Sequence, residues 1–458
     1  MVRTTQLVPV VASLVALAGT FASSGLHAQT SGDQPDNLAQ SSPNLPGMLA
    51  MPGFSPSCAK YDALSTRANA VMLNTPTCET LFPELGGARA WLAGYGIGFS
   101  ASFAPTYQYD VLGHNHNPQM YGGQDPTWSQ SLMPTLTYDL SRIGFSKDSQ
   151  LTLQGMWQTS DYRNSVPHVA SMTIFAINQR FLNDQLEVQY GYYPLIAQYY
   201  GFVLGGNASS AALGPGSVIP FEVGMSSSEP TPGFDITVRD PSLRWYNHFS
   251  VARSQSPEGV LADIDANPSG FRLTVPGARA IFVDEFGYKT QASPTSRSMW
   301  FRVGTIYNTS HYTSLETGAD TRNNYAVYVA ATYQITHPDS SPRGLYADVK
   351  LDYAPQDRNL FTKDYQLALY YIGPFKNRPA DMVSLGLTQS FFSKTAQNNV
   401  SLTGIPAAAS SLALSLSYAA RVMRGVYSVT GLTYQKNPTF APTQPNALLF
   451  QQSINISF

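Results

Sequence analysis

The chain has 458 residues, of which 12% are charged and 12% are aromatic. Roughly 25% of the residues in ordinary soluble domains are charged, so this composition disfavours a water-exposed protein and favours a lipid-facing surface. The 27 basic and 29 acidic residues nearly balance, and the formal net charge of −2 gives no sign of a nucleic-acid or strongly anionic partner.

The first 28 residues have the layout of a secretory signal peptide. Arg3 precedes an apolar stretch from Leu7 to Ala22, and small and polar residues lead to a cleavage site after Ala28. A membrane-anchoring helix is the alternative, but Pro9 and Gly19 interrupt the stretch, which falls short of the ~20 apolar residues that a span requires. No second long apolar run follows, so a mature chain within a membrane must be a β-barrel.

Residues 29–85 predict an irregular N-terminal segment in the periplasm or in the barrel mouth, because Pro, Ser and Asn are frequent there. The segment contains both cysteines of the chain, Cys58 and Cys78. An oxidising compartment favours a disulfide between them, and two unpaired thiols are the alternative. Without a supporting pair of histidines, two cysteines make a poor zinc site.

From residue 86 onwards, apolar residues alternate with small or polar residues, which is the period-2 pattern of strands with two different faces. The contrast is sharpest in residues 345–353, where Asp348, Lys350 and Asp352 alternate with apolar residues. Either the charged face meets external water, as in a soluble barrel, or it lines a wet lumen while the apolar face meets lipid. The signal peptide, the low charge and the C-terminus favour the second interpretation.

Sixteen strand-like runs are expected, near residues 95, 132, 150, 172, 186, 243, 270, 280, 300, 326, 346, 366, 384, 412, 426 and 448. Turn-forming clusters separate them, and residues 203–232 form a stretch too long for a tight hairpin. Sixteen strands enclose a water-accessible lumen rather than one filled by side chains. We therefore predict an all-β fold: a transmembrane antiparallel β-barrel of about 16 strands over residues 86–458, in the bacterial outer membrane.

The end of the chain carries a separate signal. Ile454, Ile456 and Phe458 fall on one strand face and the sequence stops on the aromatic residue, although Gln452 interrupts that face. This ending resembles the C-terminal strand of bacterial outer-membrane proteins, which the barrel-assembly machinery reads. The resemblance implies that Ile454, Ile456 and Phe458 form the assembly signal.

Stretches near both ends of the barrel region follow a known pattern. Residues 87–92 (Gly-Ala-Arg-Ala-Trp-Leu) precede Gly96-Ile97-Gly98-Phe99, residues 430–438 read Thr-Gly-Leu-Thr-Tyr-Gln-Lys-Asn-Pro, and residues 446–448 open the final strand. Together with residues 418–421, these stretches resemble the opening, penultimate and final strands of the OprB family of carbohydrate-selective porins. Leu85-Gly86-Gly87 stands where that family usually has a Trp-Gly-Gly-type sequence.

The resemblance implies passive diffusion of carbohydrates and other small polar solutes, without enzymatic activity, metal or cofactor. Aromatic rings and paired polar groups at a constriction would bind the C–H faces and hydroxyls of a sugar. An electrostatic lining without sugar selectivity is the alternative role for each candidate. The candidates are the charged residues on expected lumen faces: Glu187, Arg244, Arg272, Arg302, Asp348, Lys350 and Asp352.

Tryptophan positions add to this picture. Trp128, Trp157 and Trp245 are expected in the belt at the lipid interface. Trp300 shares a strand face with Arg302, and the sequence does not decide whether Trp300 faces the lipid or the lumen.

Other functions are less well supported by the sequence. His248 and Ser250 share a strand face at a spacing like that in outer-membrane phospholipases, but a lipid hydrolase also needs an orienting group and exposure at the lipid edge. A barrel for hydrophobic substrates is disfavoured by the charged residues between 348 and 352. His114 and His116 in one loop do not make a metal site. The expected partners are small carbohydrates, outer-membrane lipids and the barrel-assembly machinery, and a homo-oligomer is compatible with the sequence.

Overall fold

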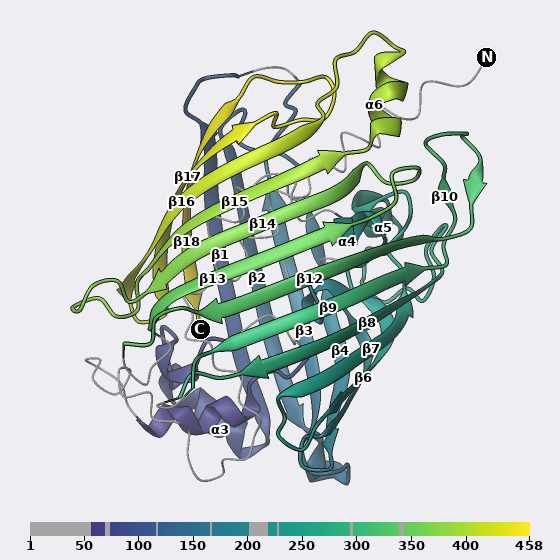
Figure 1. Cartoon of the computed structure of the whole chain (residues 1–458). Helices are drawn as coiled ribbons and strands as arrows, with labels where there is room; N and C mark the ends of the chain where they lie inside the picture. The colour runs from purple at the N-terminus through teal and green to yellow at the C-terminus, as the bar shows by residue number, and fades with distance from the viewer. Residues whose placement is uncertain are drawn as a thin grey trace.

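Each barrel strand pairs with its neighbours in the chain, and the last pairs with the first, so that sixteen antiparallel strands close into one barrel (Figure 1). The computed structural model describes residues 56–68, 74–115, 118–164, 167–200, 219–226, 229–293, 296–338 and 343–458. The expected signal peptide lies outside these residues. The closed antiparallel sheet confirms the predicted fold class.

The strand bounds follow the alternating runs of the sequence. They are β1 Ile97–Asp110, β2 Thr127–Asp139, β3 Ser149–Ser160, β4 Val169–Phe181, β5 Leu186–Tyr193, β6 Thr231–Arg239, β7 Trp245–Arg253, β8 Ala280–Thr290, β9 Met299–Asn308, β12 Asn324–Gln334, β13 Gly344–Tyr353, β14 Phe361–Ile372, β15 Met382–Phe392, β16 Ser410–Met423, β17 Val426–Lys436 and β18 Ala447–Ser457.

The two ends of the barrel differ in their connections. Short turns, one of which contains η5 (Leu140–Ile143), join the strands at the end that holds the C-terminus (Figure 1). Longer connections at the other end contain α5 (Val260–Ala266), the strand pair β10 (Tyr312–Thr313) and β11 (Asp320–Thr321), and α6 (Lys394–Ser401). In outer-membrane barrels the short turns face the periplasm and the long loops face the exterior, which orients this barrel.

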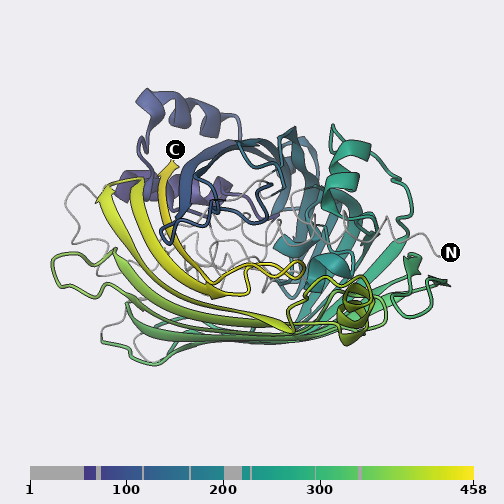
Figure 2. The ribbon, with the colours of Figure 1, turned by 90° about the horizontal axis from the view of Figure 1, so that it is seen from above.

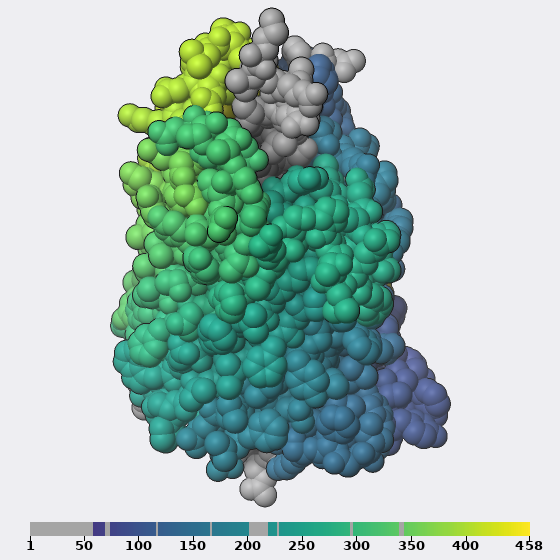
Figure 3. Space-filling model, turned by 90° about the vertical axis from the view of Figure 1, so that its right-hand side faces the viewer, coloured from purple at the N-terminus to yellow at the C-terminus, as the bar shows by residue number. Residues whose placement is uncertain are grey.

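The outer wall of the barrel is apolar because alternate strand residues point away from the lumen. In β13, Leu351 is exposed on the outside while Lys350 and Asp352 are buried on the inside. Trp128, Trp157 and Trp245 are 59%, 43% and 49% exposed, as residues of a lipid-interface belt would be. Figure 3 shows the wall over the teal strands as a closed surface. Among the described helices, none has the length and apolar character to cross a membrane.

The segment before β1 forms short helices at the periplasmic end, beside the C-terminus (Figure 2). They are η2 (Pro56–Leu64), η3 (Thr77–Glu79), η4 (Leu85–Gly87) and α3 (Ala88–Gly94). Residues 87–92, compared above with an opening strand, therefore lie mainly in a helix, and the first strand begins at Ile97.

A disulfide joins Cys58 to Cys78 and closes a loop that reaches the inner wall of the barrel. Beyond η2, the backbone N–H of Arg67 donates to Gln150 Oε1 on β3 at 2.9 Å. The carbonyl of Ala68 accepts a hydrogen bond from Gln189 Nε2 on β5 at 3.4 Å. The N-terminal segment is thus bound to the lumen side of two strands.

The sequence prediction missed one strand and placed another wrongly. It missed β6, whose first residues include Pro232 and Gly233 and therefore read as the end of a loop. The strand expected near residue 270 is wrong, because residues 267–279 form a connection between α5 and β8. Phe271 of this connection packs on Phe175 and Tyr192 with ring centroids 5.9 and 5.5 Å apart, so its alternating apolar residues reflect surface packing.

Candidate functional site

Two described parts of the connection between β5 and β6 fold back into the barrel. Residues 229–230 apart, the described parts are residues 194–200, with η6 (Leu195–Ala197), and residues 219–226, with α4 (Ile219–Glu222). We call these two parts the inserted connection. The hydroxyls of Tyr199 and Ser250 hydrogen-bond on the inward face of β7, and Asn308 Nδ2 on β9 donates to the carbonyl of Val223 at 2.8 Å. The inserted connection therefore lies against the inner wall.

Glu222 joins the inserted connection to the loop between β13 and β14. Its two carboxylate oxygens accept backbone N–H bonds from Leu360 at 3.0 Å and from Phe361 at 2.9 Å. Burial raises the pKa of Glu222 to about 8, although the two backbone bonds act in the opposite direction. A titratable group thus holds two extracellular connections together.

Five inward side chains on β7, β8, β9 and β12 form a network that we call the arginine group. Glu285 accepts a hydrogen bond from Tyr246 at 2.7 Å on one carboxylate oxygen and from Tyr328 at 2.6 Å on the other. The Arg302 guanidinium lies 3.9 Å from the ring centroid of Trp300 and 4.0 Å from Glu285. Trp300 Nε1 donates to the Tyr246 hydroxyl at 2.8 Å, so Trp300 faces the inside of the barrel.

Glycines leave room for the two tyrosines of the arginine group. A Cβ at Gly287 would overlap the ring of Tyr246, and a Cβ at Gly304 would overlap the ring of Tyr328. Gly304 lies directly opposite Glu285 in the β8–β9 register and opposite Tyr328 in the β9–β12 register. The missing side chain lets the Tyr328 ring cross β9 to reach the carboxylate on β8.

A second network, the lysine group, consists of Tyr200, Asp348, Lys350, Asp352 and Asp364. The Tyr200 hydroxyl donates to Asp352, and the Lys350 ammonium lies 4.2 Å from the centre of the Tyr200 ring. Asp352 and Asp364 are opposite each other in the β13–β14 register. Both carboxylate oxygens of Asp348 are buried without a hydrogen-bond partner among the described residues. The group therefore contains three carboxylates around one ammonium.

Two adjacent residues of the inserted connection link these groups. Arg302 Nη1 donates to the carbonyl of Tyr199, and the Tyr200 ring meets the Tyr328 ring edge-on at 5.5 Å. Arg302, Asp348, Lys350 and Asp352, all expected on lumen faces, are thereby brought to one region of the inner wall.

Glu187 lies apart from this region, near the periplasmic end of β5. Its carboxylate pairs with Arg239 at 2.6 Å and with Arg180 at 3.6 Å, and it accepts a hydrogen bond from Asn178 at 2.7 Å. Glu187 is on the inward face, but two cations and an amide already occupy its oxygens.

Arg244 and Arg272 do not lie on lumen faces of strands, so their expected placement is wrong. Arg244 is exposed in the periplasmic turn before β7, where its N–H donates to Asp240 at 2.9 Å. Arg272 is exposed in the connection between α5 and β8, where its N–H donates to Asn267 at 2.9 Å. Near Arg244 the alternation of apolar residues extends beyond the start of β7. Near Arg272 the same alternation occurs in a connection that contains no barrel strand, so in both cases it predicted a strand face that is not there.

Several residues of the two groups were not singled out from the sequence. Tyr246, Glu285 and Tyr328 alternate with apolar residues in their strands, and that signal could have identified them as inward. Tyr199 and Tyr200 lie in a connection without periodicity, so no sequence pattern indicates that they enter the lumen.

The pair His248 and Ser250 does not match a lipid hydrolase. Asp235 lies 3.8 Å from His248 Nε2, but the Ser250 hydroxyl is fully buried and bonded to Tyr199 on the lumen side. A lipid ester at the outer wall does not reach this serine.

Metal-binding side chains are sparse where the structure is described. No group of three or more His, Cys, Asp or Glu residues there has a geometry that could hold a metal ion. His114 Nδ1 pairs with Asp110 at 2.8 Å, and His116 lies outside the described residues.

The arginine and lysine groups combine the kinds of side chain that recognise a polyhydroxylated solute. Carboxylates accept bonds from hydroxyls, guanidinium and ammonium groups donate to ring and hydroxyl oxygens, and aromatic rings pack on C–H faces.

Comparisons with known proteins agree with this geometry. Residues 137–458 match the family described as carbohydrate-selective porin, OprB family. The high-pH structure of Pseudomonas putida OprB is similar, with a TM-score of 0.71 at 16% identity, and the match covers 86% of this chain and 100% of that chain. The low-pH structure of Pseudomonas putida OprB gives a TM-score of 0.53 at 16% identity, with 83% and 98% covered. At these identities the structural likeness shows the fold. No curated protein sequence gives a significant match.

Proposed function

The chain belongs to the OprB family of carbohydrate-selective porins of the outer membrane, and from this membership and its lumen we propose that the arginine and lysine groups select the sugars that pass. Transport is passive, because the fold and the family are those of a diffusion channel. The observation that carries the proposal is the meeting of Arg302, Trp300 and Lys350 with tyrosines of the inserted connection on one inner wall.

The charged residues on the inner wall also bear on the competing functions. Asp348, Lys350 and Asp352 place three charged side chains on the inner wall, where a passage for apolar solutes would need apolar side chains. A barrel for hydrophobic substrates is therefore less well supported than a sugar channel, and a lipid hydrolase is not supported by the buried Ser250.

Liposome swelling tests the proposed function. Liposomes that contain the purified full-length chain should swell in mono- and disaccharides, and Arg302→Gln should lower the sugar rate about tenfold or more, since a lost charge-assisted hydrogen bond costs about 1.5–3 kcal/mol. Arg163→Gln, at an exposed ion pair with Asp265, is the control that should leave the rate unchanged. Swelling with salts and amino acids but not with sugars would contradict sugar transport.

The C-terminal strand has the features of a signal that the barrel-assembly machinery would bind. Ile454 is 42% exposed on the outer face of β18, on the same face as Ile456, and Phe458 follows at the periplasmic rim. We propose that these three residues are the assembly signal. Phe458→Ala should reduce the amount of heat-modifiable barrel in the outer membrane, whereas substitution of the polar inward residue Asn455 should have a smaller effect.

The outer wall also has a polar pair that suits contact with another copy of the chain. Asp284 points outward from the middle of β8, between Phe282 and Phe286, and accepts a hydrogen bond from Asn247 at 2.8 Å. A carboxylate in lipid is unfavourable, so we propose that β7 and β8 lie in a homo-oligomer interface. Asp284→Lys should dissociate the oligomer on native gels, and a monomeric wild-type protein in mild detergent would contradict the proposal.

A further inference from the structure

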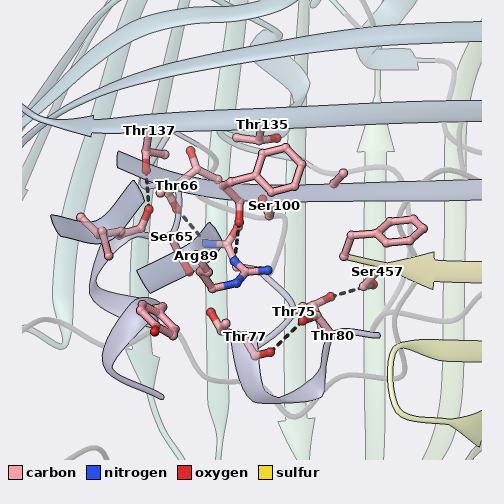
Figure 4. A pocket seen from close by; sticks show the side chains of 18 of the residues that line it. Ser65, Thr66, Thr75, Thr77, Thr80, Arg89, Ser100, Thr135, Thr137 and Ser457 are labelled. Atoms are coloured by element: carbon pink, nitrogen blue, oxygen red, sulfur yellow. Dashed lines mark hydrogen bonds between the residues drawn. The ribbon is translucent and has the colours of Figure 1, made fainter. Parts of the chain in front are cut away.

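A pocket lies at the periplasmic end of the barrel, remote from the arginine and lysine groups. The N-terminal segment forms one side, and the inner wall of β1 and β2 with the end of β18 forms the other (Figure 4). The hollow has a cavity volume of about 60 Å³ and is partly open to solvent, so that a bound sugar ring would be only partly enclosed. A solute that leaves the lumen towards the periplasm passes this region.

Arg89 is the polar centre of the pocket. Its side chain points into the hollow from α3, and the residue is only 4% exposed (Figure 4). Nη1 donates to the carbonyl of Phe99, but Nε and Nη2 are buried without a hydrogen-bond partner among the described residues. Buried guanidinium donors without acceptors are costly, so these two N–H groups indicate an acceptor oxygen supplied by a bound molecule.

The charges around Arg89 favour a neutral molecule over an anion. Asp62 and Glu84 lie close enough to interact electrostatically with the guanidinium. Their hydrogen bonds lead elsewhere: Asp62 accepts from the Thr77 N–H at 2.7 Å, and Glu84 accepts from the Tyr61 hydroxyl at 2.8 Å. The two carboxylates offset the cation without occupying Nε and Nη2.

The remaining lining suits a ring of hydroxyls. Thr77, Thr80, Ser100, Thr135 and Thr137 line the hollow, and the hydroxyls of Thr80 and Thr137, which donate to backbone carbonyls, can still accept a hydrogen bond. Ser100 lies on the inward face of β1, next to Arg89 in Figure 4, and is exposed to the hollow. Hydroxyl groups that both donate and accept can exchange hydrogen bonds with a sugar in several orientations.

We propose that this pocket is a second carbohydrate site, which binds a neutral sugar ring at the periplasmic exit through the Nε and Nη2 donors of Arg89. The inference rests on the proposed passage of sugars through the lumen, and it extends that function with a site on the exit side. Such a site holds a sugar at the exit for a short time and so affects its release into the periplasm.

Saturation-transfer NMR on the detergent-solubilised full-length chain tests the site, with glucose and gluconate as probes. The Arg302→Gln background weakens the lumen site, so that the remaining glucose signal reports the pocket. In that background, Arg89→Gln and, separately, Ser100→Leu should raise the apparent Kd for glucose about tenfold or more, because one removes the donors and the other fills the hollow. Arg142→Gln, which removes an exposed donor to the Gly94 carbonyl outside the pocket, should leave the Kd unchanged.

The outcomes separate the pocket from the lumen site. Unchanged glucose binding in both pocket variants would overturn the proposed carbohydrate site in the pocket and leave the lumen proposal intact. That result would mean that water alone accepts the hydrogen bonds of Arg89. Tighter binding of gluconate than of glucose would overturn the neutral-ligand inference. Sugar swelling of Arg302→Gln that equals the wild-type rate, with glucose binding at the pocket retained, would instead contradict the lumen proposal. If Arg89→Gln does not assemble, as judged by heat-modifiable mobility, the apparent Kd of Ser100→Leu for glucose tests the pocket on its own.

Discussion

Tyr328 reaches Glu285 by lying across Gly304, the residue opposite it on β9. Position 304 lies between the tyrosine on β12 and the carboxylate on β8, and a Cβ there would overlap the aromatic ring. The arginine group thus depends on a residue that contributes no side chain to it.

Gly304→Ala should displace the Tyr328 ring and break its bond to Glu285. We expect a loss of about 1–3 kcal/mol in the free energy of unfolding, as for other overpacked sites, together with weaker sugar binding. Denaturant unfolding of the detergent-solubilised barrel measures the first effect. Gly155→Ala is the matched control, because its Cβ would have its nearest neighbours at an ordinary 3.8 Å. Equal stability of the two variants would contradict this account.

The lysine group should set the ion selectivity of the channel. Three carboxylates surround Lys350, so the local field favours cations over anions. Asp348→Asn should shift the reversal potential in a KCl gradient towards anions and leave the conductance of the same order. Asp265→Asn removes an exposed carboxylate that pairs with Arg163 and serves as the control. A selectivity that follows Asp265 rather than Asp348 would mean that the lysine group does not face the ion path.

The fold could be predicted from the sequence because each strand has one lipid-facing side. Charged side chains are unfavourable in lipid and are therefore rare on that side. The resulting alternation identifies strands such as β13 without any knowledge of the strands they pair with. β6 was missed because Pro232 and Gly233 are as typical of turns as of a strand start. The false strand near residue 270 arose because Phe271 packs on Phe175, so that a loop acquired an apolar pattern.

The site could be predicted only where it lies on strands. Period-2 alternation placed Arg302, Asp348, Lys350 and Asp352 on inward faces, but it does not show which inward residues meet across the barrel. Tyr199 and Tyr200 come from a connection that folds into the lumen, and such long-range contacts leave no local pattern. Arg89 was part of a family pattern in the sequence, but its unpaired donors are visible only in the folded chain.

Docking of the inserted connection should depend on pH through Glu222. The pKa of this carboxyl is about 8 in the folded chain, above its ordinary value of 4.5, so the docked state holds the proton more tightly than the undocked state. Docking should therefore be most stable below pH 4.5, weaken as the pH rises from 4.5 to 8, and change little above that.

Single-channel conductance between pH 4 and pH 9 measures this dependence. The wild type should show more frequent open-state fluctuations as the pH rises, and Glu222→Gln should remove the trend. Glu222→Ala should weaken docking at every pH, because two buried backbone donors lose their acceptor at a cost of about 1–3 kcal/mol each. The same pH trend in Glu222→Gln as in the wild type would assign it to another group.

The disulfide should keep the N-terminal segment against the inner wall. It closes a loop with a sequence separation of 20 between Cys58 and Cys78, and within that loop Ala68 accepts a hydrogen bond from Gln198 of the inserted connection. Closing a loop of about this length stabilises a fold by roughly 3 kcal/mol, so a Cys58→Ser, Cys78→Ser double variant should release the segment more often. Trypsin should then cleave after Lys60 and Arg67 faster than in the wild type, while heat-modifiable mobility shows that the barrel is intact. Cleavage after the exposed Arg163 provides the internal reference, and equal rates at Lys60 and Arg67 in both proteins would show that barrel contacts alone hold the segment.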